Sequence, residues 1–255
     1  FLDRNMKDLA AEAVKGALDS AGIDKSKLEA AVVGNATAGL ITGQEMIRGQ
    51  VVLREIGIGG IPVINTENAC ASSSTAFHIA WLYVASGMYD VALAVGMEKL
   101  YHEDKRRSFQ AIGAAVDVEW VQQIQAQMKA ARGNGGAAGE TPAPDEGAGE
   151  KRSMFMDFYA AFARQHMQRY GTTKEQFARI AVKNHFHGSL NPHAQYREVY
   201  TLEDVLNSPL VAEPLTRLMC SPIGDGAAAA VLCSADKAKQ FTTKPVHVLA
   251  SCVGS

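Results

Sequence analysis

The 255-residue sequence has only four cysteines, no long hydrophobic run and no large excess of charge of either sign. Its formal net charge is −2 at pH 7, so neither nucleic acid nor a membrane surface is indicated as a bulk partner. The apolar runs are short, such as residues 227–232, whereas a membrane-spanning helix needs roughly 20 apolar residues. Charged residues also interrupt the first turns, which argues against a signal peptide there. We therefore expect no nucleic-acid partner and no membrane partner.

The cysteines lie at positions 70, 220, 233 and 252, and no two of them form a Cys-x-x-Cys pair. This spacing argues against a zinc ribbon or a thioredoxin-type site within the chain. Because a low cysteine density is typical of a reducing compartment, we expect a cytoplasmic protein. The chain starts with Phe1, and residues 246–252 have the composition of a strand that opens a further unit. We therefore expect the chain to be part of a longer protein.

Helices and strands alternate along the first part of the sequence. Hydrophobic residues recur at helical spacing over residues 6–21, and Gly22 is placed to end that helix. Two further helices are predicted at residues 45–56 and 70–86. Apolar runs typical of buried strands occupy four short segments, at residues 30–35, 61–65, 91–96 and 226–234. This alternation, with strands apolar on both faces, predicts an α/β fold with a parallel sheet covered by helices.

The pattern changes between about residues 100 and 220, where a mostly helical excursion interrupts the α/β core. Residues 153–187 are predicted to be helical, with a break at residues 170–172. Residues 133–149 are rich in Gly, Ala, Pro and Glu and contain no large apolar residue. Such a composition predicts a flexible surface insertion or a disordered loop.

Cys70 lies in the segment NTENACASSSTAFHIA, residues 65–80, between a polar turn and the start of a predicted helix. The first N–H groups of a helix are unpaired and its dipole is positive there, and both effects favour a thiolate. A nucleophile between a strand and a helix is also exposed at the edge where open α/β sheets bind ligands. Cys70 is thus either a reactive nucleophile or, as free cysteines often are, a small buried packing residue. The other three cysteines lie in or beside apolar strands and are predicted to be core residues.

A cysteine nucleophile needs a base and an oxyanion hole, and the positions of the histidines do not supply the base. His78 follows Cys70 by eight residues, which is ~12 Å along one helix and too far for proton transfer. We therefore interpret His78 as structural. His185, His187 and His193 cluster in KNHFHGSLNPH, which is typical of a hydrogen-bonded loop. No carboxylate lies near them at helical ligand spacing, so we predict no metal site.

Three segments together resemble the thiolase family. Residues 65–100, NTENACASSSTAFHIAWLYVASGMYDVALAVGMEKL, are similar to its active-cysteine segment, which runs from an Asn-rich turn through Cys-Ala-Ser to Gly-Met-Glu. Residues 220–232, CSPIGDGAAAAVL, resemble the Asp-Gly-Ala strand that closes the N-terminal half. Residues 183–206, KNHFHGSLNPHAQYREVYTLEDVL, are similar to the loop domain of the sterol-carrier-protein-X-like branch of acetyl-CoA acyltransferases. The resemblance covers essentially the whole chain.

The resemblance implies a thiolase-like α/β/α layered fold with an inserted, mostly helical loop domain. Residues 1–116 would form the first part of the N-terminal α/β core. Residues 117–219 would form the loop domain, with the flexible insertion at 133–149. Residues 220–255 would return to the core and start a C-terminal half whose remainder is not in this chain.

The resemblance also implies acyl transfer, in the manner of β-oxidation of lipids. Cys70 would attack the 3-oxo carbon of a 3-oxoacyl-CoA, an acyl-CoA would leave, and free CoA would then take the acyl group from Cys70. Coenzyme A would be a co-substrate, and no tightly bound cofactor or metal would be needed because the thioester supplies the activation. Met97 matches the Gly-Met-Glu turn near the pocket. Met154 and Met156 would line the acyl pocket, although methionine is equally a core filler.

Two features depart from the family pattern. The family's histidines and second cysteine come from His-Pro-Gly-type and Cys-Gly-Gly-type segments, and neither segment is in this chain. The stretch 133–149 is longer than expected for the loop domain. Some members of this branch work with a small subunit that has a zinc ribbon and an oligonucleotide-binding fold, and the stretch is a candidate docking element for it. The family is usually homodimeric or tetrameric, so we also expect a homodimer or a larger assembly.

Three functions remain open at this point. The first is CoA-dependent thiolytic cleavage of a 3-oxoacyl-CoA, with a bulky or aromatic acyl group as one candidate. The second is a non-catalytic thiolase-like subunit of a multi-subunit acyl-CoA complex, and the third is a condensing enzyme of the same superfamily. We favour the first, because a site that has lost its catalytic function has no need to retain a cysteine at the start of a helix.

Overall fold

The computed structural model describes residues 1–123, 126, 153–242 and 244–254. The chain divides into two compact units. Unit 1 consists of Phe1–Glu103 and Gly224–Ser255, and unit 2 consists of Asp104–Ile223. Unit 2 is thus inserted into unit 1 along the sequence. The predicted organisation has the same nesting, with a loop domain at 117–219 inserted into a core at 1–116 and 220–255. The observed units change over at residues 103/104 and 223/224.

Unit 1 contains a four-stranded sheet in the order β2-β1-β3-β6. The strands are β1 (Ala30–Gly34), β2 (Val63–Thr66), β3 (Val91–Glu98) and β6 (Gly226–Cys233). The prediction of a parallel sheet is correct for β1, β2 and β3, but β6 runs antiparallel to β3. The chain leaves the sheet at the end of β3 and returns at the same edge after unit 2, so β6 pairs with β3 in the opposite direction.

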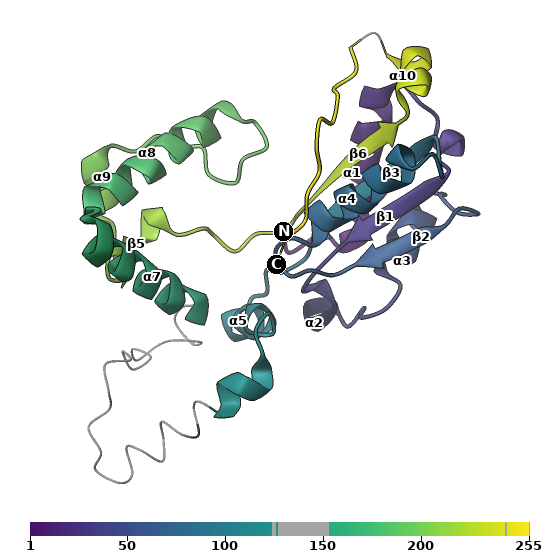
Figure 1. Ribbon diagram of the computed structural model, residues 1–255. Helices are drawn as coiled ribbons and strands as arrows, with labels where there is room; N and C mark the ends of the chain where they lie inside the picture. Colours follow the sequence, from purple (N-terminus) through teal and green to yellow (C-terminus); the bar gives the residue numbers. More distant parts are fainter. Residues whose placement is uncertain (124–125, 127–152, 243, 255) are drawn as a thin grey trace. The chain divides into compact units, whose positions relative to one another are not determined.

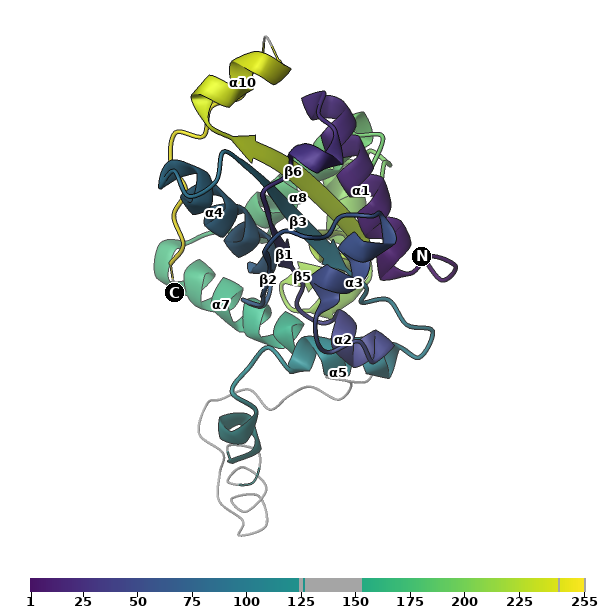
Figure 2. The same cartoon turned by 90° about the vertical axis from the view of Figure 1, so that its right-hand side faces the viewer.

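Helices cover both faces of this sheet, which confirms the predicted α/β/α layering. Helices α1 (Met6–Ala21) and α3 (Arg48–Glu55) lie on one face, and α4 (Ser72–Ala85) lies on the other (Figure 2). Alternate residues of the strands face the two sides, because side chains alternate along a strand. The core on the α1 side includes Val14, Val33, Leu53, Leu93 and Val95. The core on the α4 side includes Val32, Ala76, Ala80, Ala92 and Ala94. Unit 1 also contains α2 (Ala38–Thr42), α10 (Ala235–Phe241) and the short 3-10 helix η1 (Lys25–Lys27).

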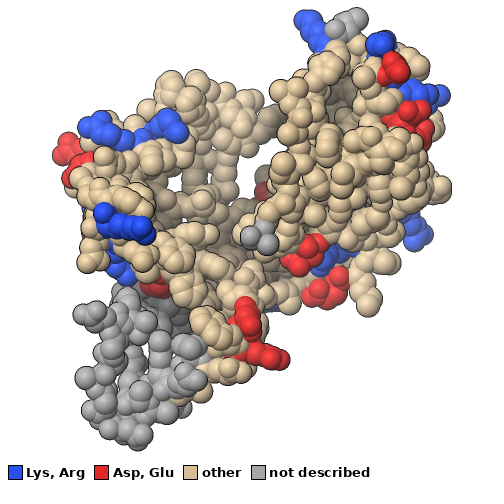
Figure 3. Space-filling model, viewed as in Figure 1, with Lys and Arg blue, Asp and Glu red and all other residues tan. Residues whose placement is uncertain are grey.

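The ends of the helices follow from local chemistry. A capping box of Asn5 and Asp8 starts α1, and Gly22 ends it with a φ of 67°, as predicted. The two later helices begin further along than predicted, α3 at Arg48 and α4 at Ser72. Helix α4 contains no Lys, Arg, Asp or Glu, and the surface over this part of unit 1 is largely uncharged (Figure 3). A helix without charged residues on any side is typical of one that is covered in a larger protein.

The segment after β6 corrects two predictions. Residues 246–252 were expected to form a strand, but no strand is present within residues 244–254. Val246 and Leu249 are almost fully exposed. A strand needs a neighbour for its main-chain groups, and this segment pairs with none of the strands of the described sheet. Cys252 is likewise exposed and not a core residue, while Cys220 and Cys233 are half-buried.

Unit 2 is mostly helical, as the sequence predicted (Figure 1). Within its described residues, the helices include α5 (Lys105–Gly113), α7 (Met154–Tyr170), α8 (Lys174–Leu190) and α9 (Leu202–Asn207), and residues 118–123 are also helical. Its other elements include β4 (Leu210–Ala212), β5 (Leu215–Thr216) and the 3-10 helix η2 (Arg217–Met219). The predicted break at 170–172 is confirmed: Gly171 ends α7 in the left-handed conformation, and Thr173 starts α8 through a capping box. The predicted flexible stretch 133–149 lies outside the described residues.

Candidate active site

Cys70 is exposed and lies between the end of β2 and the start of α4. The register of the sheet aligns Gly34 of β1 with Thr66 of β2 and with Gly96 of β3, so these three parallel strands end at one edge. The turn that carries Cys70 begins directly after Thr66. This is the edge at which open α/β sheets bind their ligands. The position excludes the alternative that Cys70 is a buried packing residue of the described chain.

The turn before Cys70 has a strained backbone that several hydrogen bonds hold in place. Ala69 has a φ of 43°, which is unusual for a residue other than glycine. The N–H of Ala69 donates to Glu67 Oε1 at 2.6 Å, and Ser72 Oγ donates to the carbonyl of Ala69 at 2.8 Å. Ser72 Oγ also accepts from the N–H of Asn68 at 2.8 Å. Strain of this kind persists only where the surroundings over-determine it, and it is concentrated at functional sites.

The first turn of α4 follows Cys70 directly. Ala71 is the N-cap and makes no side-chain capping bond. The main-chain N–H groups of Ser73 and Ser74 find no hydrogen-bond acceptor in the part of the chain that the structure describes. Free N–H donors therefore point out of the end of α4 that is nearest to Cys70 in the chain, as the sequence predicted.

Two glycines allow the start of α4 to lie directly against the sheet. A Cβ atom at Gly34 would lie 2.6 Å from the carbonyl carbon of Ser72, and one at Gly96 would lie 2.5 Å from Cβ of Ser73. Both distances are far below van der Waals contact. Thr66 Oγ1 adds a hydrogen bond of 3.1 Å to the carbonyl of Ser72. The sheet thus fixes the residues directly after Cys70.

The end of β3 carries a second polar cluster at the same edge. The carboxylate of Glu98 accepts hydrogen bonds from Asn35 Nδ2 at 3.0 Å and from the N–H groups of Ala36 and Thr37. Asn35 is buried and also donates to the carbonyl of Met97 at 2.8 Å. Glu98 therefore organises the loop that follows β1. The sequence contained Glu98 within its Gly-Met-Glu match, but nothing in it indicated that Asn35 was its partner.

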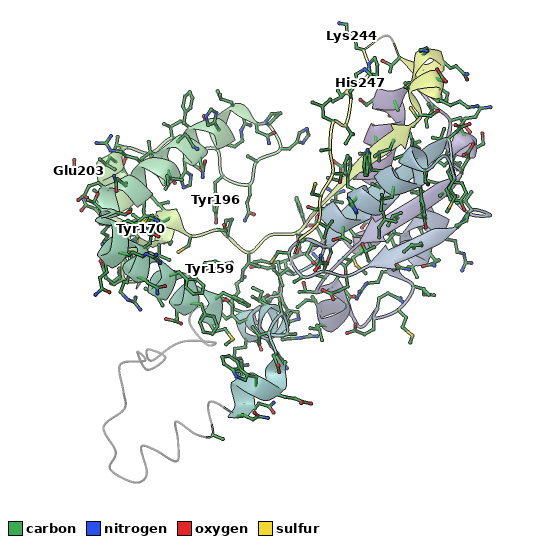
Figure 4. All side chains as sticks on the ribbon, viewed as in Figure 1. Tyr159, Tyr170, Tyr196, Glu203, Lys244 and His247 are labelled. Carbon is green, nitrogen blue, oxygen red and sulfur yellow. The ribbon has the colours of Figure 1, made fainter. Side chains whose placement is uncertain are left out.

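The predicted substrate-binding methionines lie in different environments. The side chain of Met97 is buried in the core on the α1 side of the sheet, which is the role of a packing residue. Met154 and Met156 are half-buried at the start of α7, in unit 2. Cys70 belongs to unit 1, so a site that joins it to these methionines stays a prediction. Helix α7 also exposes aromatic side chains, among them Tyr159 and Tyr170 (Figure 4).

Two of the histidines, His78 and His185, have structural partners. His78 Nδ1 lies 3.0 Å from Ser251 Oγ, and its ring is near Trp81. His185 Nε2 lies 3.2 Å from the carbonyl of Leu218, and its ring meets Tyr200 edge-on. The described residues contain no group of three or more His, Cys, Asp or Glu that could hold a metal ion. No helix in this described part has both the length and the apolar character needed to cross a bilayer.

A family model and several known proteins that resemble this chain all indicate one family. Residues 1–236 match the family described as thiolase, N-terminal domain. The chain is 40% identical to an acetyl-CoA acetyltransferase of Methanothermobacter thermautotrophicus, over 99% of this chain and 58% of that protein. It is 34% identical to the benzoylsuccinyl-CoA thiolase subunit BbsB of Thauera aromatica, over 94% of this chain and 54% of that protein. It is 35% identical to sterol carrier protein 2 of Gallus gallus, over 95% of this chain and 40% of that protein.

A solved structure supports the same assignment. The Ltp2-ChsH2(DUF35) aldolase matches with a TM-score of 0.64 and 26% sequence identity, over 94% of this chain and 53% of that chain. The chain thus spans about half the length of the relatives that it matches. On the family match over residues 1–236 and on the layered fold around Cys70, the chain belongs to the thiolase family, of which these residues form the N-terminal domain.

Proposed function

We propose that this chain supplies the nucleophile of a CoA-dependent acyltransferase of the thiolase type, with Cys70 as the catalytic residue. The observation that carries the proposal is the placement of Cys70: an exposed thiol on a strained turn, directly before a helix that two glycines bring against the sheet. Acetyl-CoA acetyltransferases at 38–40% identity over most of the chain support the same chemistry.

The proposed reaction has two acyl-transfer steps. The thiolate of Cys70 attacks the 3-oxo carbon of a 3-oxoacyl-CoA, the bond between C2 and C3 breaks, and acetyl-CoA leaves as an enolate that takes a proton. The thiol of free CoA then attacks the thioester on Cys70, and Cys70 leaves as a thiolate. CoA is a substrate in this scheme, and no redox step occurs. We assign the acid and the base of both steps to residues outside this chain, which spans about half the length of its relatives.

We propose a bulky or aromatic acyl group for the substrate. Helix α7 carries a row of aromatic side chains at helical spacing, at Phe155, Phe158, Tyr159 and Phe162. The rings of Phe155 and Phe158 meet edge-on with centroids 6.1 Å apart, and Tyr159 and Phe162 are exposed. Exposed aromatic side chains offer large contact areas to apolar ligands. The name of the benzoylsuccinyl-CoA thiolase subunit supports this choice of substrate class. Met154 and Met156 would flank this row of aromatic side chains, one on each side of it.

We also propose that the protein acts in an assembly, in the cytoplasm, in β-oxidation. The name of the matched structure, Ltp2-ChsH2(DUF35) aldolase, mentions a DUF35 component, which supports a small partner subunit of the predicted zinc-ribbon and oligonucleotide-binding type. Strand β2 forms an edge of the sheet, and its Ile64 is 39% exposed. An exposed strand edge can pair with a second copy, so this edge supports a homodimer.

The proposal is tested by acyl labelling of Cys70 and by the turnover and assembly of Cys70→Ala. The full-length protein is mixed with a panel of 3-oxoacyl-CoA esters and its intact mass is measured, with peptide mapping of the adduct. An acyl group on Cys70 in the wild type and in Cys252→Ala, and none in Cys70→Ala, is the expected result. Cys252 is the matched control because it is also exposed. For a non-catalytic subunit, Cys70→Ala would change assembly and leave turnover unaltered, and that outcome would overturn the proposal.

A further inference from the structure

A short loop follows β1 at the same edge of the sheet as Cys70. We call residues 35–37 the β1 loop. The N–H of Asn35 donates to the carbonyl of Thr66, the last residue of β2, at 3.2 Å. The hydroxyl of Thr66 donates in turn to the carbonyl of Ser72, at 3.1 Å. Two consecutive hydrogen bonds therefore connect the β1 loop to the start of α4.

Ser72 also fixes the strained turn that carries Cys70. Its hydroxyl donates to the carbonyl of Ala69, whose backbone is left-handed, at 2.8 Å. Its main chain lies directly against Gly34, where a Cβ atom would overlap it. Gly34 is the residue immediately before the β1 loop. A displacement of this loop therefore reaches the Cys70 turn by two routes, through Thr66 and through Gly34.

The carboxylate of Glu98 holds the β1 loop from the end of β3. Its Oε2 accepts hydrogen bonds from the N–H groups of Ala36 and Thr37, at 3.2 and 3.1 Å. Its Oε1 accepts from Asn35 Nδ2 at 3.0 Å and from the N–H of Lys99 at 3.1 Å. Within the described residues, no cationic side chain forms an ion pair with Glu98, so its charge is stabilised by N–H donors alone. Because both oxygens face donors, a glutamine in its place would turn an NH2 group toward a donor.

The side chain of Asn35 is fixed in one orientation although one of its atoms lacks a partner. Nδ2 donates to the carbonyl of Met97 at 2.8 Å and to Glu98, so the reversed amide would place its oxygen against two acceptors. Asn35 is 3% exposed, and its Oδ1 has no hydrogen-bond partner in the part of the chain that the structure describes. A buried acceptor without a partner destabilises the folded state. A leucine of similar size would avoid this cost, which indicates that the amide is needed for the groups that it holds and not for packing.

We propose that Glu98 is a positioning residue for Cys70, which acts through the β1 loop with Asn35 as its partner. The carboxylate fixes the loop, the loop fixes Thr66 and Gly34, and these two residues fix the turn that carries the thiol. The consequence for acyl transfer rests on the function proposed above. A loosened loop would let the strained turn relax, and the thiolate would then approach the 3-oxo carbon in a less favourable geometry. Glu98 acts in this way without contact with the substrate.

The test compares Glu98→Gln and Asn35→Leu in the full-length protein, with Glu29→Gln as the matched control. Glu29 lies near the opposite end of β3, where its carboxylate accepts a hydrogen bond from the N–H of Asp90 at 2.6 Å. It therefore has the same kind of partner as Glu98, but it belongs to the edge of the sheet that does not carry Cys70.

The first measurement is amide hydrogen exchange, which reports local opening and needs no substrate. In Glu98→Gln we expect exchange over residues 36–37 to accelerate about tenfold, because these amides lose their charged acceptor. We expect exchange over residues 68–72 to accelerate about threefold or more, because the loop no longer holds the turn. Asn35→Leu leaves Glu98 its main-chain donors and should change the same two segments by less. Glu29→Gln should exchange like the wild type in both segments.

The second measurement is the rate at which a 3-oxoacyl-CoA ester acylates Cys70, as a function of ester concentration. In Glu98→Gln we expect kcat and the acylation rate to fall about tenfold or more while KM stays within about twofold, because a misplaced nucleophile slows the chemical step. A double variant that combines Asn35→Leu with Glu98→Gln should be no slower than Glu98→Gln, since both changes act through one loop. If Glu98→Gln does not fold, Asn35→Leu provides the same comparison, with a fall of about threefold. It should fold, because it removes the unpartnered acceptor together with the donor.

Three outcomes would overturn the inference. One is unchanged exchange at residues 68–72 in both variants, and another is acylation at the wild-type rate in Glu98→Gln. The third is a double variant that is slowed by the product of the two single effects, as expected for independent structural defects. A wild-type protein that forms no acyl adduct would contradict the proposed function alone. Exchange at residues 68–72 would then still decide whether Glu98 holds the Cys70 turn.

Discussion

A single methyl group added at Gly34 should displace the start of α4 and, with it, Cys70. The Cβ of an alanine there would lie 2.6 Å from the carbonyl carbon of Ser72, whereas carbon atoms in contact prefer about 3.5–4.0 Å. The contacting atoms belong to the main chain, so no side-chain rotation relieves the overlap. The helix must move away from β1 by about 1 Å to restore an ordinary contact.

The magnitude of the effect follows from two opposing terms. Overpacking of this kind costs about 1–3 kcal/mol of stability, and exchanging glycine for alanine within a strand returns about 0.5–1 kcal/mol. We therefore expect Gly34→Ala to lower the free energy of unfolding by about 1–2 kcal/mol. A shift of about 1 Å in a reacting group costs about 10²-fold in rate, so acylation of Cys70 should slow by about that factor.

Gly16 provides the matched control for Gly34. It lies in the interior of α1, and a Cβ there would meet no atom within 4 Å. Gly16→Ala should therefore stabilise the protein by up to about 1 kcal/mol and leave acylation unchanged. Urea unfolding and the time course of the Cys70 acyl adduct measure both quantities. A Gly34→Ala protein with wild-type stability and wild-type acylation would refute the reasoning about this contact.

Three further predictions concern the thiols, the buried carboxylate of Asp225 and the strained turn. Iodoacetamide should label Cys70 well before Cys220 and Cys233, because burial raises the pKa of both of these thiols and limits access; equal rates at all three, measured by peptide mapping of the folded protein, would contradict this. Burial opposes the charge of Asp225, but hydrogen bonds from Lys99, Tyr101 and Leu100 outweigh it. The lowered pKa of Asp225 in the folded protein adds stability that is fully present above the pKa of the unfolded chain, about 3.9, and is lost as the pH falls through the folded pKa. Urea unfolding across this range should therefore show that the free energy of unfolding depends less on pH in Asp225→Asn than in the wild type. Ala69→Gly should be at least as stable as the wild type, whereas Ala69→Val should lose about 1–2 kcal/mol because its backbone is left-handed; equal stability of both variants would count against strain at this turn.

Local patterns in the sequence predicted most of the elements of unit 1. The spacing of Leu9 and Val14 and the glycine at position 22 were sufficient for α1, because its amphipathic face and its cap are both local features. The strand at 91–96 was recognised from its apolar run, since β3 is buried on both faces. The place of Cys70 between a strand and a helix indicated an exposed turn but left a buried packing role open, and the structure shows Cys70 to be exposed.

The features that were missed depend on contacts between distant segments. The antiparallel direction of β6 follows from the path of the chain through unit 2, which no local pattern encodes. Residues 246–252 have the composition of a strand but lack a neighbour in the described sheet, so their apolar side chains stay exposed. The left-handed backbone of Ala69 is imposed by Glu67 and Ser72 and not by alanine itself. Asp225 is buried only because Lys99 and the amides that follow it converge on its carboxylate.

The most direct test of the central claim is the mass of the full-length protein after brief exposure to 3-oxoacyl-CoA esters. The account predicts one acyl group per chain, located on Cys70 by peptide mapping and released when free CoA is added. The same adduct should form in Cys252→Ala and be absent from Cys70→Ala. A folded protein that acquires no acyl group from any ester, or acquires it on another cysteine, would contradict Cys70 as the nucleophile.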